Sequence, residues 1–222
     1  AEPALGYGER WAVVRWLDGE HPAVYRGDET DLSGLAADLA DVLVALRGIE
    51  VSRAALADDD LDNYRGRPLA EHDTQMRRNI ERCRSIDGLD VDLDQVQAIW
   101  TQALELPGAR EGTERTWYHG DLVAENLLLS GGRLTGVLDF GGLGVGDPSV
   151  DLHGAWELDP QSREVFRERL GVREPEWLRG RAWALAIAIM TFPYYWSTMP
   201  RRVGDRLAMA RSVLRDAAVN PG

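Results

Sequence analysis

The sequence contains no lysine, since all 25 of its Lys and Arg positions are arginine. A P-loop NTPase needs a lysine that reaches the β- and γ-phosphates of its nucleotide, and a Schiff-base enzyme needs a lysine amine. This chain alone can supply neither chemistry. Cys83 is the single cysteine, so an internal disulfide is excluded and a reducing, cytoplasmic location is favoured. Cys83 falls within a predicted helix, Met76 to Arg84, where a packing role is expected.

Long hydrophobic runs and excess positive charge are also absent. The longest apolar stretch, Ala182 to Tyr195, is shorter than the roughly 20 residues that cross a bilayer and contains Pro193, so a buried core helix is predicted. The N-terminus has neither the basic segment nor the apolar run of a secretory signal. The formal net charge of −12 argues against nucleic acid or an anionic membrane as a partner. An acidic face would suit a polycationic ligand, although general solubility explains it more simply.

Hydrophobic patterning over the 222 residues predicts a mainly helical chain with one sizeable core or two small ones. Trp11 to Leu17 predicts a strand that ends in a turn at Asp18-Gly19. Because the next predicted strand begins only at Thr116, this first strand is expected to be the last piece of a sheet whose other strands are missing. Helices are predicted over Leu32 to Leu46, capped by Asp31 or Ser33 and closed by Gly48; from the Asp92/Gln95 capping box to Leu104; from Pro175 to Thr191; and from Asp205 to Ala218.

The segment from Glu50 to Asp73 is rich in aspartate and contains Gly66 and Pro68, which predicts a loop with short helical turns. A solvated acidic loop is the default interpretation. The functional alternative is the lip of a site for a polycationic substrate.

Strand signals return in the middle of the chain. Strands are predicted at Thr116 to His119, Asn126 to Leu129 and Arg133 to Phe140, and the last two form a hairpin around Ser130-Gly131-Gly132. Asp147-Pro148 then predicts a helix start, because an aspartate cap is followed by proline at the first helical position. This helix is expected to run through Trp156.

Three side chains at the two ends of that hairpin carry the chemistry. Asp121 and Asn126 lie in the loop that begins at His119, and Asp139 ends the returning strand, so all three can converge on one point. Phosphoryl transfer through a loose transition state asks for oxygen ligands to Mg²⁺ and a carboxylate that orients the incoming hydroxyl. This set of residues supplies both.

The segments HGDLVAENLLL, VLDFGGLGVGDPSVDL and, more weakly, VVRWLDGE resemble the aminoglycoside phosphotransferase family of small-molecule kinases, which shares its catalytic layout with protein kinases. The match is specific from His119 to Leu152, where an H-x-D-x-x-x-x-N motif precedes D-F-G. The resemblance implies an α+β, mainly helical C-terminal lobe of a kinase-like fold with a small catalytic β-hairpin. Residues 1–20 would be the end of the small lobe and the hinge. Residues 21–222 would be the helical lobe, with a catalytic loop at 119–126 and a metal-binding segment at 139–141.

The resemblance also implies roles for individual residues. Asp121 corresponds to the catalytic carboxylate, and Asn126 and Asp139 correspond to the Mg²⁺ ligands. Five positions would contact the nucleotide, through the hinge backbone or beneath the adenine: Arg15, Trp16, Leu17, Leu128 and Leu138. Three others are expected to support the site rather than react: His119, Asp147 and Asp151.

Two departures from the family pattern matter. Gly120 stands where regulated protein kinases carry arginine, so constitutive action on a small molecule fits better than signalling. The glycine-rich loop, the lysine that grips the phosphates and its glutamate partner should all precede the hinge, and they are not in this sequence. We therefore expect weak or no activity from the 222 residues alone. The glycines from Gly141 to Gly146 do not form G-x-G-x-x-G, and a flexible loop is predicted there.

The predicted function is transfer of the γ-phosphoryl group of ATP or GTP, with Mg²⁺, to a hydroxyl of a small molecule. An aminoglycoside-like antibiotic is the favoured acceptor, which would make the protein a resistance enzyme. One alternative is a metal-dependent phosphohydrolase with four ligands: His119, Asp121, Asp139 and His153. The other alternative is a non-catalytic module that binds a ligand or dimerises.

Overall fold

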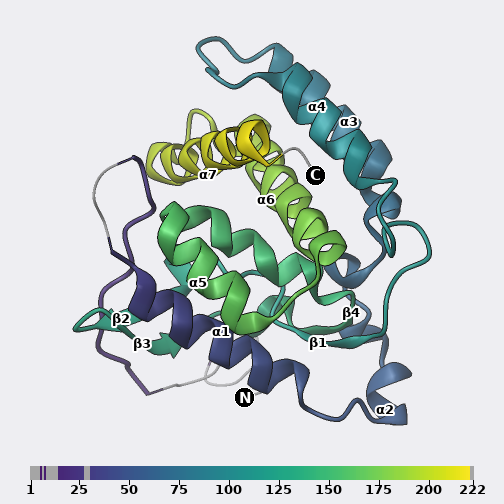
Figure 1. The fold of residues 1–222 in the computed structure, drawn as a ribbon, viewed down its shortest axis with the longest axis vertical. Helices are drawn as coiled ribbons and strands as arrows, with labels where there is room; N and C mark the ends of the chain where they lie inside the picture. The colour runs from purple at the N-terminus through teal and green to yellow at the C-terminus, as the bar shows by residue number, and fades with distance from the viewer. Residues whose placement is uncertain (1–5, 7, 9–14, 28–30, 221–222) are drawn as a thin grey trace.

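The computed structural model describes residues 6, 8, 15–27 and 31–220 and is mainly helical, as the sequence predicts (Figure 1). Its α-helices are α1 (Ser33–Arg47), α2 (Arg53–Leu56), α3 (Asp73–Arg84), α4 (Leu93–Ala103), α5 (Pro160–Leu170), α6 (Glu174–Tyr195) and α7 (Pro200–Val219). Six 3-10 segments join them: η1 (Asp59–Leu61), η2 (Tyr64–Gly66), η3 (Leu69–His72), η4 (Ala124–Asn126), η5 (Phe140–Gly142) and η6 (Pro148–Glu157). Two antiparallel pairs of strands complete the fold: β1 (Thr116–Tyr118) with β4 (Gly144–Gly146), and β2 (Leu127–Ser130) with β3 (Arg133–Val137).

Helix α6 lies at the centre of the core, with α7, α3, α4 and η6 packed around it (Figure 1). It is buried over nearly all of the stretch from Trp177 to Phe192, so the prediction of a buried core helix is confirmed. The helix does not stop at Thr191 but continues through Pro193 to Tyr195. Proline cannot donate to the carbonyl four residues earlier. That carbonyl, on Ile189, instead accepts from the buried Cys83 thiol at 3.5 Å, which gives the single cysteine a packing role.

The N-caps predicted at Asp92 and Asp147 are confirmed, and the one predicted for α1 is wrong. The last helix, α7, starts at Pro200 and not at the predicted Asp205. Asp92 accepts from the backbone of Gln95 at 2.9 Å and starts α4, and Asp147 caps η6, although η6 is a 3-10 rather than an α-helix. Helix α1 has Leu32 as its N-cap and no side-chain cap of its own. The Leu32 N–H donates to Ser162 at 3.0 Å. Ser162 belongs to α5, a helix that the sequence analysis did not predict and that lies beside α1 (Figure 1).

The predicted first strand is not seen where the structure describes it. Residues 15–17 are irregular, and Trp11 to Val14 lie outside the described residues. Glu20 instead pairs with Leu129 through two backbone hydrogen bonds of 2.7 and 2.9 Å, which lays the linker against the β2–β3 hairpin. The hairpin is held from its other side by α1, because Asp38 accepts from the Arg133 guanidinium at 2.7 Å and from the Leu134 N–H at 3.1 Å.

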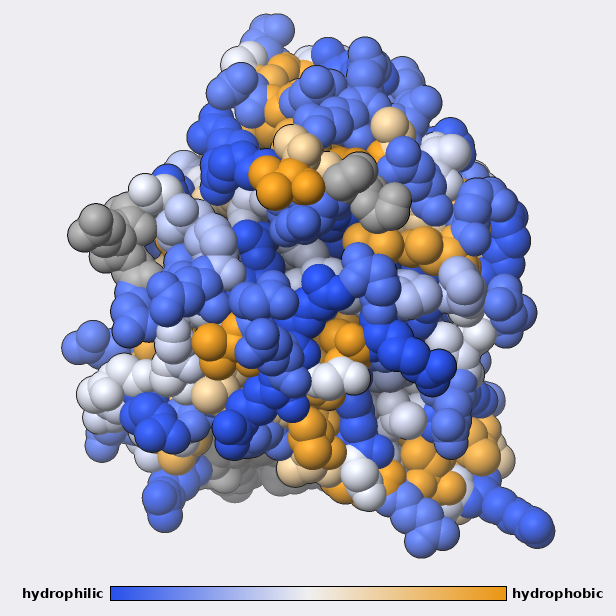
Figure 2. All heavy atoms as spheres, in the orientation of Figure 1, coloured by the Kyte–Doolittle hydropathy of each residue, from blue (hydrophilic) through white to orange (hydrophobic). Residues whose placement is uncertain are grey.

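The acidic segment between α1 and α3 forms short turns, as predicted. Side-chain caps start three of them, at Ser52, Asp58 and Asn63. None of the described helices is long and apolar enough to cross a membrane. The face shown in Figure 2 is mostly hydrophilic, and its hydrophobic residues form small separate groups.

The glycine-rich stretch after Asp139 is not a flexible loop. Gly144 to Gly146 form β4, which is buried and pairs with β1. A Cβ on Gly144 would lie 2.3 Å from the Tyr118 hydroxyl, and one on Gly146 would lie 2.3 Å from the Gly66 carbonyl. These glycines are therefore required by close packing against Tyr118 and Gly66, not by backbone freedom.

Gly146→Ala is accordingly expected to lower the free energy of unfolding by about 2 kcal/mol, because the neighbour that must move is backbone and cannot rotate away. Chemical denaturation measures this directly. The matched control is Gly136→Ala on β3, where the added Cβ would have its nearest neighbours at 3.4 Å, an ordinary contact. Equal stability for the two variants would contradict the packing argument.

Candidate active site

The loop from His119 to Asn126 connects β1 to β2 and brings Asp121 and Asn126 together. The Asn126 amide nitrogen donates to the Asp121 backbone carbonyl at 2.8 Å and to its Oδ2 at 3.1 Å. These two bonds turn the amide nitrogen toward Asp121, so the amide oxygen points the other way. Asn126 is buried, whereas the Asp121 side chain is 29% exposed and open to an incoming group.

Asp139 reaches the same end of the hairpin. The Leu138 N–H donates to the Asn126 carbonyl at 2.8 Å, which places Asp139 one residue beyond this contact. Asp139 is exposed and has φ 57°, the only positive φ among the described non-glycine residues. Such a conformation costs energy and is concentrated at functional sites. Its Oδ1 accepts from the Gly141 N–H at 3.3 Å, which fixes the turn.

The donor set fits a hard divalent cation. The exposed Asp139 carboxylate and the Asn126 amide oxygen are the oxygen ligands that Mg²⁺ prefers. The described residues contain no group of three or more His, Cys, Asp or Glu side chains placed to hold a metal ion. The four ligands of the alternative phosphohydrolase are therefore not assembled. His153 bonds the Val150 carbonyl through Nδ1, and burial lowers the pKa of its imidazole to about 4.

His119 and Asp151 both form hydrogen bonds with the backbone of this loop. The His119 ring is buried. Its Nδ1 accepts a hydrogen bond from the Asp121 N–H at 3.2 Å, and its Nε2 hydrogen-bonds the Leu138 carbonyl at 3.0 Å. The Asp151 carboxylate accepts from the N–H groups of His119 and Gly120 at 2.8 and 2.7 Å. Burial raises the pKa of Asp151, and the two N–H donors act against that rise.

Asp147 stabilises the fold through contacts outside the catalytic loop. Its Oδ1 accepts from the Ser149 N–H at 3.0 Å, and its Oδ2 accepts from Arg179 at 3.2 Å. Both side chains of the Arg179–Asp147 pair are almost completely buried. The Asp147 N–H also donates to the Gly66 carbonyl at 2.8 Å, which ties η2 to η6.

The residues predicted to contact a nucleotide fall into two groups. Arg15 and Trp16 are exposed, Trp16 by 84%. Leu17 and the buried Leu128 meet beside Gly136, since a Cβ there would lie 3.4 Å from each of them. The linker and the hairpin therefore come together at these two leucines. Leu138, the remaining residue of the predicted set, is half-buried.

Arg65 is a contact of Asp121 that the sequence analysis missed. It lies in η2, and its Nη1 donates to Asp121 Oδ1 at 2.6 Å and also to the Gly120 carbonyl. Burial acts to raise the pKa of Asp121, but the charge and hydrogen bond of Arg65 act together with the charges of His153 and Arg206, and the pKa is lowered. No spacing rule connects the two residues, because 56 positions separate them.

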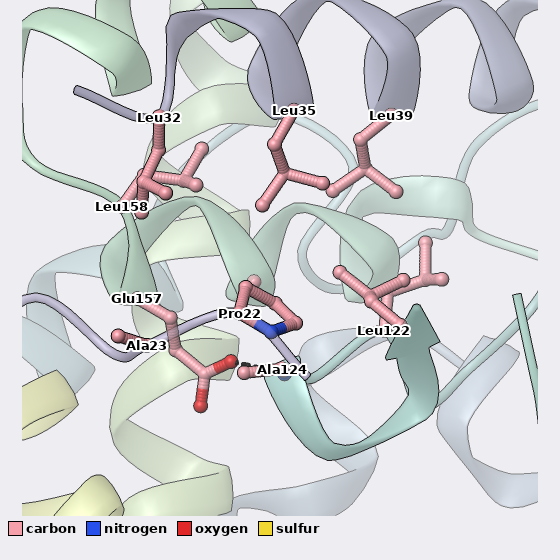
Figure 3. Close-up of a pocket in the computed structure, with 11 residues that line it drawn as sticks. Pro22, Ala23, Leu32, Leu35, Leu39, Leu122, Ala124, Glu157 and Leu158 are labelled. Atoms are coloured by element: carbon pink, nitrogen blue, oxygen red, sulfur yellow. Dashed lines mark hydrogen bonds between the residues drawn. The ribbon is translucent and has the colours of Figure 1, made fainter. Parts of the chain in front are cut away.

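Glu157 was also missed. Its Oε2 accepts from the Ala124 N–H in the catalytic loop at 2.6 Å (Figure 3), and its Oε1 pairs with Arg206 of α7. Burial raises the pKa of Glu157 to about 7, although Arg206 acts to lower it. Arg206 also bonds Glu125 at 3.2 Å. Beside Glu157 lies a small apolar cavity of about 10 Å³ (Figure 3), lined by Pro22, Ala23, Leu32, Leu35, Leu39, Leu122, Ala124, Leu127, Gly154 and Leu158.

A larger cleft of about 610 Å³ opens next to the catalytic loop. Its walls come from the linker at residues 21–26, from Ala124 and Glu125, and from residues 198–205 around the start of α7. The volume lies within the range of about 300 to 1,000 Å³ that is typical of small-molecule sites. Both of its carboxylates are paired with arginines of the chain: Glu125 with Arg202 at 3.0 Å, and Asp205 with Arg26 at 2.5 Å.

The sequence is similar to that of a known phosphotransferase. The chain is 41% identical over 115 residues to aminoglycoside 3'-phosphotransferase of Streptomyces fradiae, a match that covers 44% of this chain and 41% of that protein. The chain thus spans about two fifths of the length of that curated relative.

Solved structures show the same fold. Macrolide 2'-phosphotransferase type I superposes with a TM-score of 0.57 at 17% identity, over 90% of this chain and 67% of that one. ADP-bound aminoglycoside phosphotransferase APH(2'')-Ib superposes with a TM-score of 0.53 at 20% identity, over 90% of this chain and 71% of that one. The sequence model of the phosphotransferase enzyme family matches residues 1–183. The chain therefore belongs to the phosphotransferase enzyme family.

Proposed function

We propose that the protein transfers the γ-phosphoryl group of ATP or GTP to a hydroxyl group of a small molecule. The observation that carries the proposal is the hydrogen bond between Asp121 and Asn126, at the end of the hairpin where Leu138, the residue before Asp139, bonds the Asn126 carbonyl. Family membership supports the same reaction class. Two solved relatives were crystallised with ADP and with GDP, which supports a nucleotide as the donor.

In this proposal Asp121 orients the acceptor hydroxyl and accepts its proton as the new O–P bond forms and the nucleoside diphosphate leaves. A carboxylate with a low pKa is adequate, because in a loose transition state the proton is transferred late. The amide oxygen of Asn126 and the carboxylate of Asp139 would hold Mg²⁺. That ion would neutralise charge on the phosphates. Leu17 and Leu128 are placed to pack against the adenine or guanine base.

The cleft of about 610 Å³ is the proposed acceptor site, because Ala124 and Glu125 of the catalytic loop form part of its wall. An aminoglycoside-like compound is the first acceptor class to test, since the curated relative is an aminoglycoside 3'-phosphotransferase. Resistance to such an antibiotic would be the biological consequence. The proposal includes weak or no activity of the 222 residues alone, because they contain no lysine to grip the phosphates.

Asp139→Asn is expected to weaken Mg²⁺-dependent nucleotide binding by at least about tenfold, since altered metal sites commonly lose that much affinity. Asparagine tolerates the left-handed backbone conformation at this position, so the turn should persist. Calorimetric titration of the full-length protein with nucleotide, with and without EDTA, measures the effect. Asp87→Asn is the matched control, because Asp87 is exposed between α3 and α4. Nucleotide binding that is indifferent to EDTA would contradict the metal role.

A further inference from the structure

Arg65 hydrogen-bonds two consecutive residues of the catalytic loop, Gly120 and Asp121. Its Nη1 donates to the Gly120 carbonyl and, at 2.6 Å, to Asp121 Oδ1. Its Nε donates to the Tyr64 hydroxyl at 2.9 Å, which leaves the guanidinium little freedom to rotate. The Arg65 side chain is only 19% exposed. A guanidinium thus lies against this loop, but it comes from η2 rather than from the position of Gly120.

The backbone that carries Arg65 is held by hydrogen bonds to β1 and to the start of η6. Asn63 caps η2 by accepting from the Arg65 N–H at 3.1 Å, and the Asn63 carbonyl accepts from the Tyr118 hydroxyl at 3.1 Å. On the other side, the Gly66 carbonyl accepts from the Asp147 N–H at 2.8 Å. A Cβ on Gly66 would lie 2.2 Å from the Tyr118 ring, so nothing larger than glycine fits between η2 and β1. Arg65 therefore belongs to a fixed wall of the site.

The two carboxylate oxygens of Asp121 accept hydrogen bonds from different residues. Arg65 bonds Oδ1, and Asn126 bonds Oδ2 at 3.1 Å. Two hydrogen bonds from different elements fix the plane of the carboxylate, and each oxygen keeps a further lone pair that can accept a proton. We propose that Arg65 is a positioning residue for phosphoryl transfer, which holds the Asp121 carboxylate in the orientation that receives the acceptor hydroxyl. This inference rests on the proposed function.

In a different interpretation, Arg65 occupies the position that a cationic group of the acceptor takes on binding. The acceptor would then displace the Arg65 guanidinium. The other contacts of the guanidinium argue against it, because displacement would also have to break the Nε bond to the Tyr64 hydroxyl and the Nη1 bond to the Gly120 carbonyl. The two interpretations predict opposite results when the guanidinium is removed. Loss of a positioning residue lowers kcat, whereas loss of a side chain that competes with the acceptor lowers the KM for the acceptor or raises kcat.

The test compares Arg65→Gln and Arg65→Lys in the full-length protein by steady-state kinetics with nucleotide and acceptor. Arg65→Gln is expected to lower kcat by about 30- to 100-fold, since small misplacement of a catalytic group costs that much, with the KM for nucleotide unchanged. Arg65→Lys keeps the charge and is expected to recover part of the loss. Arg67→Gln is the control, because Arg67 is exposed in the same segment and forms only long, exposed ion pairs, with Asp62 at 3.4 Å and Glu71 at 3.9 Å.

Thermal unfolding of each variant separates positioning from folding. Equal melting temperatures for Arg65→Gln and Arg65→Lys, with different kcat values, would support positioning. Loss of activity in proportion to loss of stability in both variants would overturn it, as would full kcat in Arg65→Gln. A wild-type protein that phosphorylates no acceptor would overturn the proposed function itself, and the role of Arg65 with it.

Discussion

Asp121→Asn is expected to lower kcat for phosphoryl transfer by about 1,000-fold, within the range measured for loss of a general base. The substitution keeps the size of the side chain, and its amide oxygen can still accept from Arg65. What it removes is the negative charge and the basic lone pair that would take the proton of the acceptor hydroxyl.

The measurement is release of nucleoside diphosphate together with mass detection of the phosphorylated acceptor, in the full-length protein. Glu168→Gln on α5 makes the same change of charge at an exposed position and serves as the control. Activity within about fivefold of wild type in Asp121→Asn would show that the reaction does not use a general base here, since such bases contribute 100-fold or more.

The parts of this site that sequence reasoning predicts are those whose partners lie close together in the chain. Asp121 and Asn126 are five residues apart and lie 3.1 Å from each other as a hydrogen-bonded pair. The β2–β3 hairpin follows from the Ser130-Gly131-Gly132 turn and forms as predicted, except that β3 ends at Val137 and not at Phe140. Local rules of spacing and turn chemistry are enough for these features.

The missed parts depend on contacts between distant segments. Arg65 reaches Asp121 across 56 positions, and Glu157 reaches Ala124 across 33. Strand β4 was mistaken for a loop because its glycines are fitted to Tyr118 and to Gly66, which only the folded chain brings near. In each case the residue type suits the contacts that it makes in the fold. The neighbouring sequence does not indicate which distant segment will make those contacts.

Arg179 and Asp147, the pair that joins α6 to the start of η6, are also far apart in the sequence, by 32 positions. Arg179 Nε donates to Asp147 Oδ2 at 3.2 Å, and Nη1 donates to the Pro107 carbonyl. The two side chains are 4% and 2% exposed. Through its backbone N–H, Asp147 also holds Gly66, the neighbour of Arg65. One buried ion pair thus connects the helical core to the segment that contacts the catalytic loop.

Arg179→Met is expected to lower the free energy of unfolding by about 3 to 5 kcal/mol, because it leaves the Asp147 carboxylate buried without its countercharge. The double variant Arg179→Met with Asp147→Asn removes that stranded charge while keeping an oxygen for the Ser149 N–H. It should therefore be more stable than the single variant, a non-additivity expected of residues in contact. Arg169→Gln breaks an exposed ion pair with Asp41 and is expected to change stability within experimental error. Denaturant unfolding compares the wild type, Arg179→Met, Asp147→Asn, the double variant and Arg169→Gln. A double variant as unstable as the sum of its two single substitutions would show that the stranded charge is not the cause.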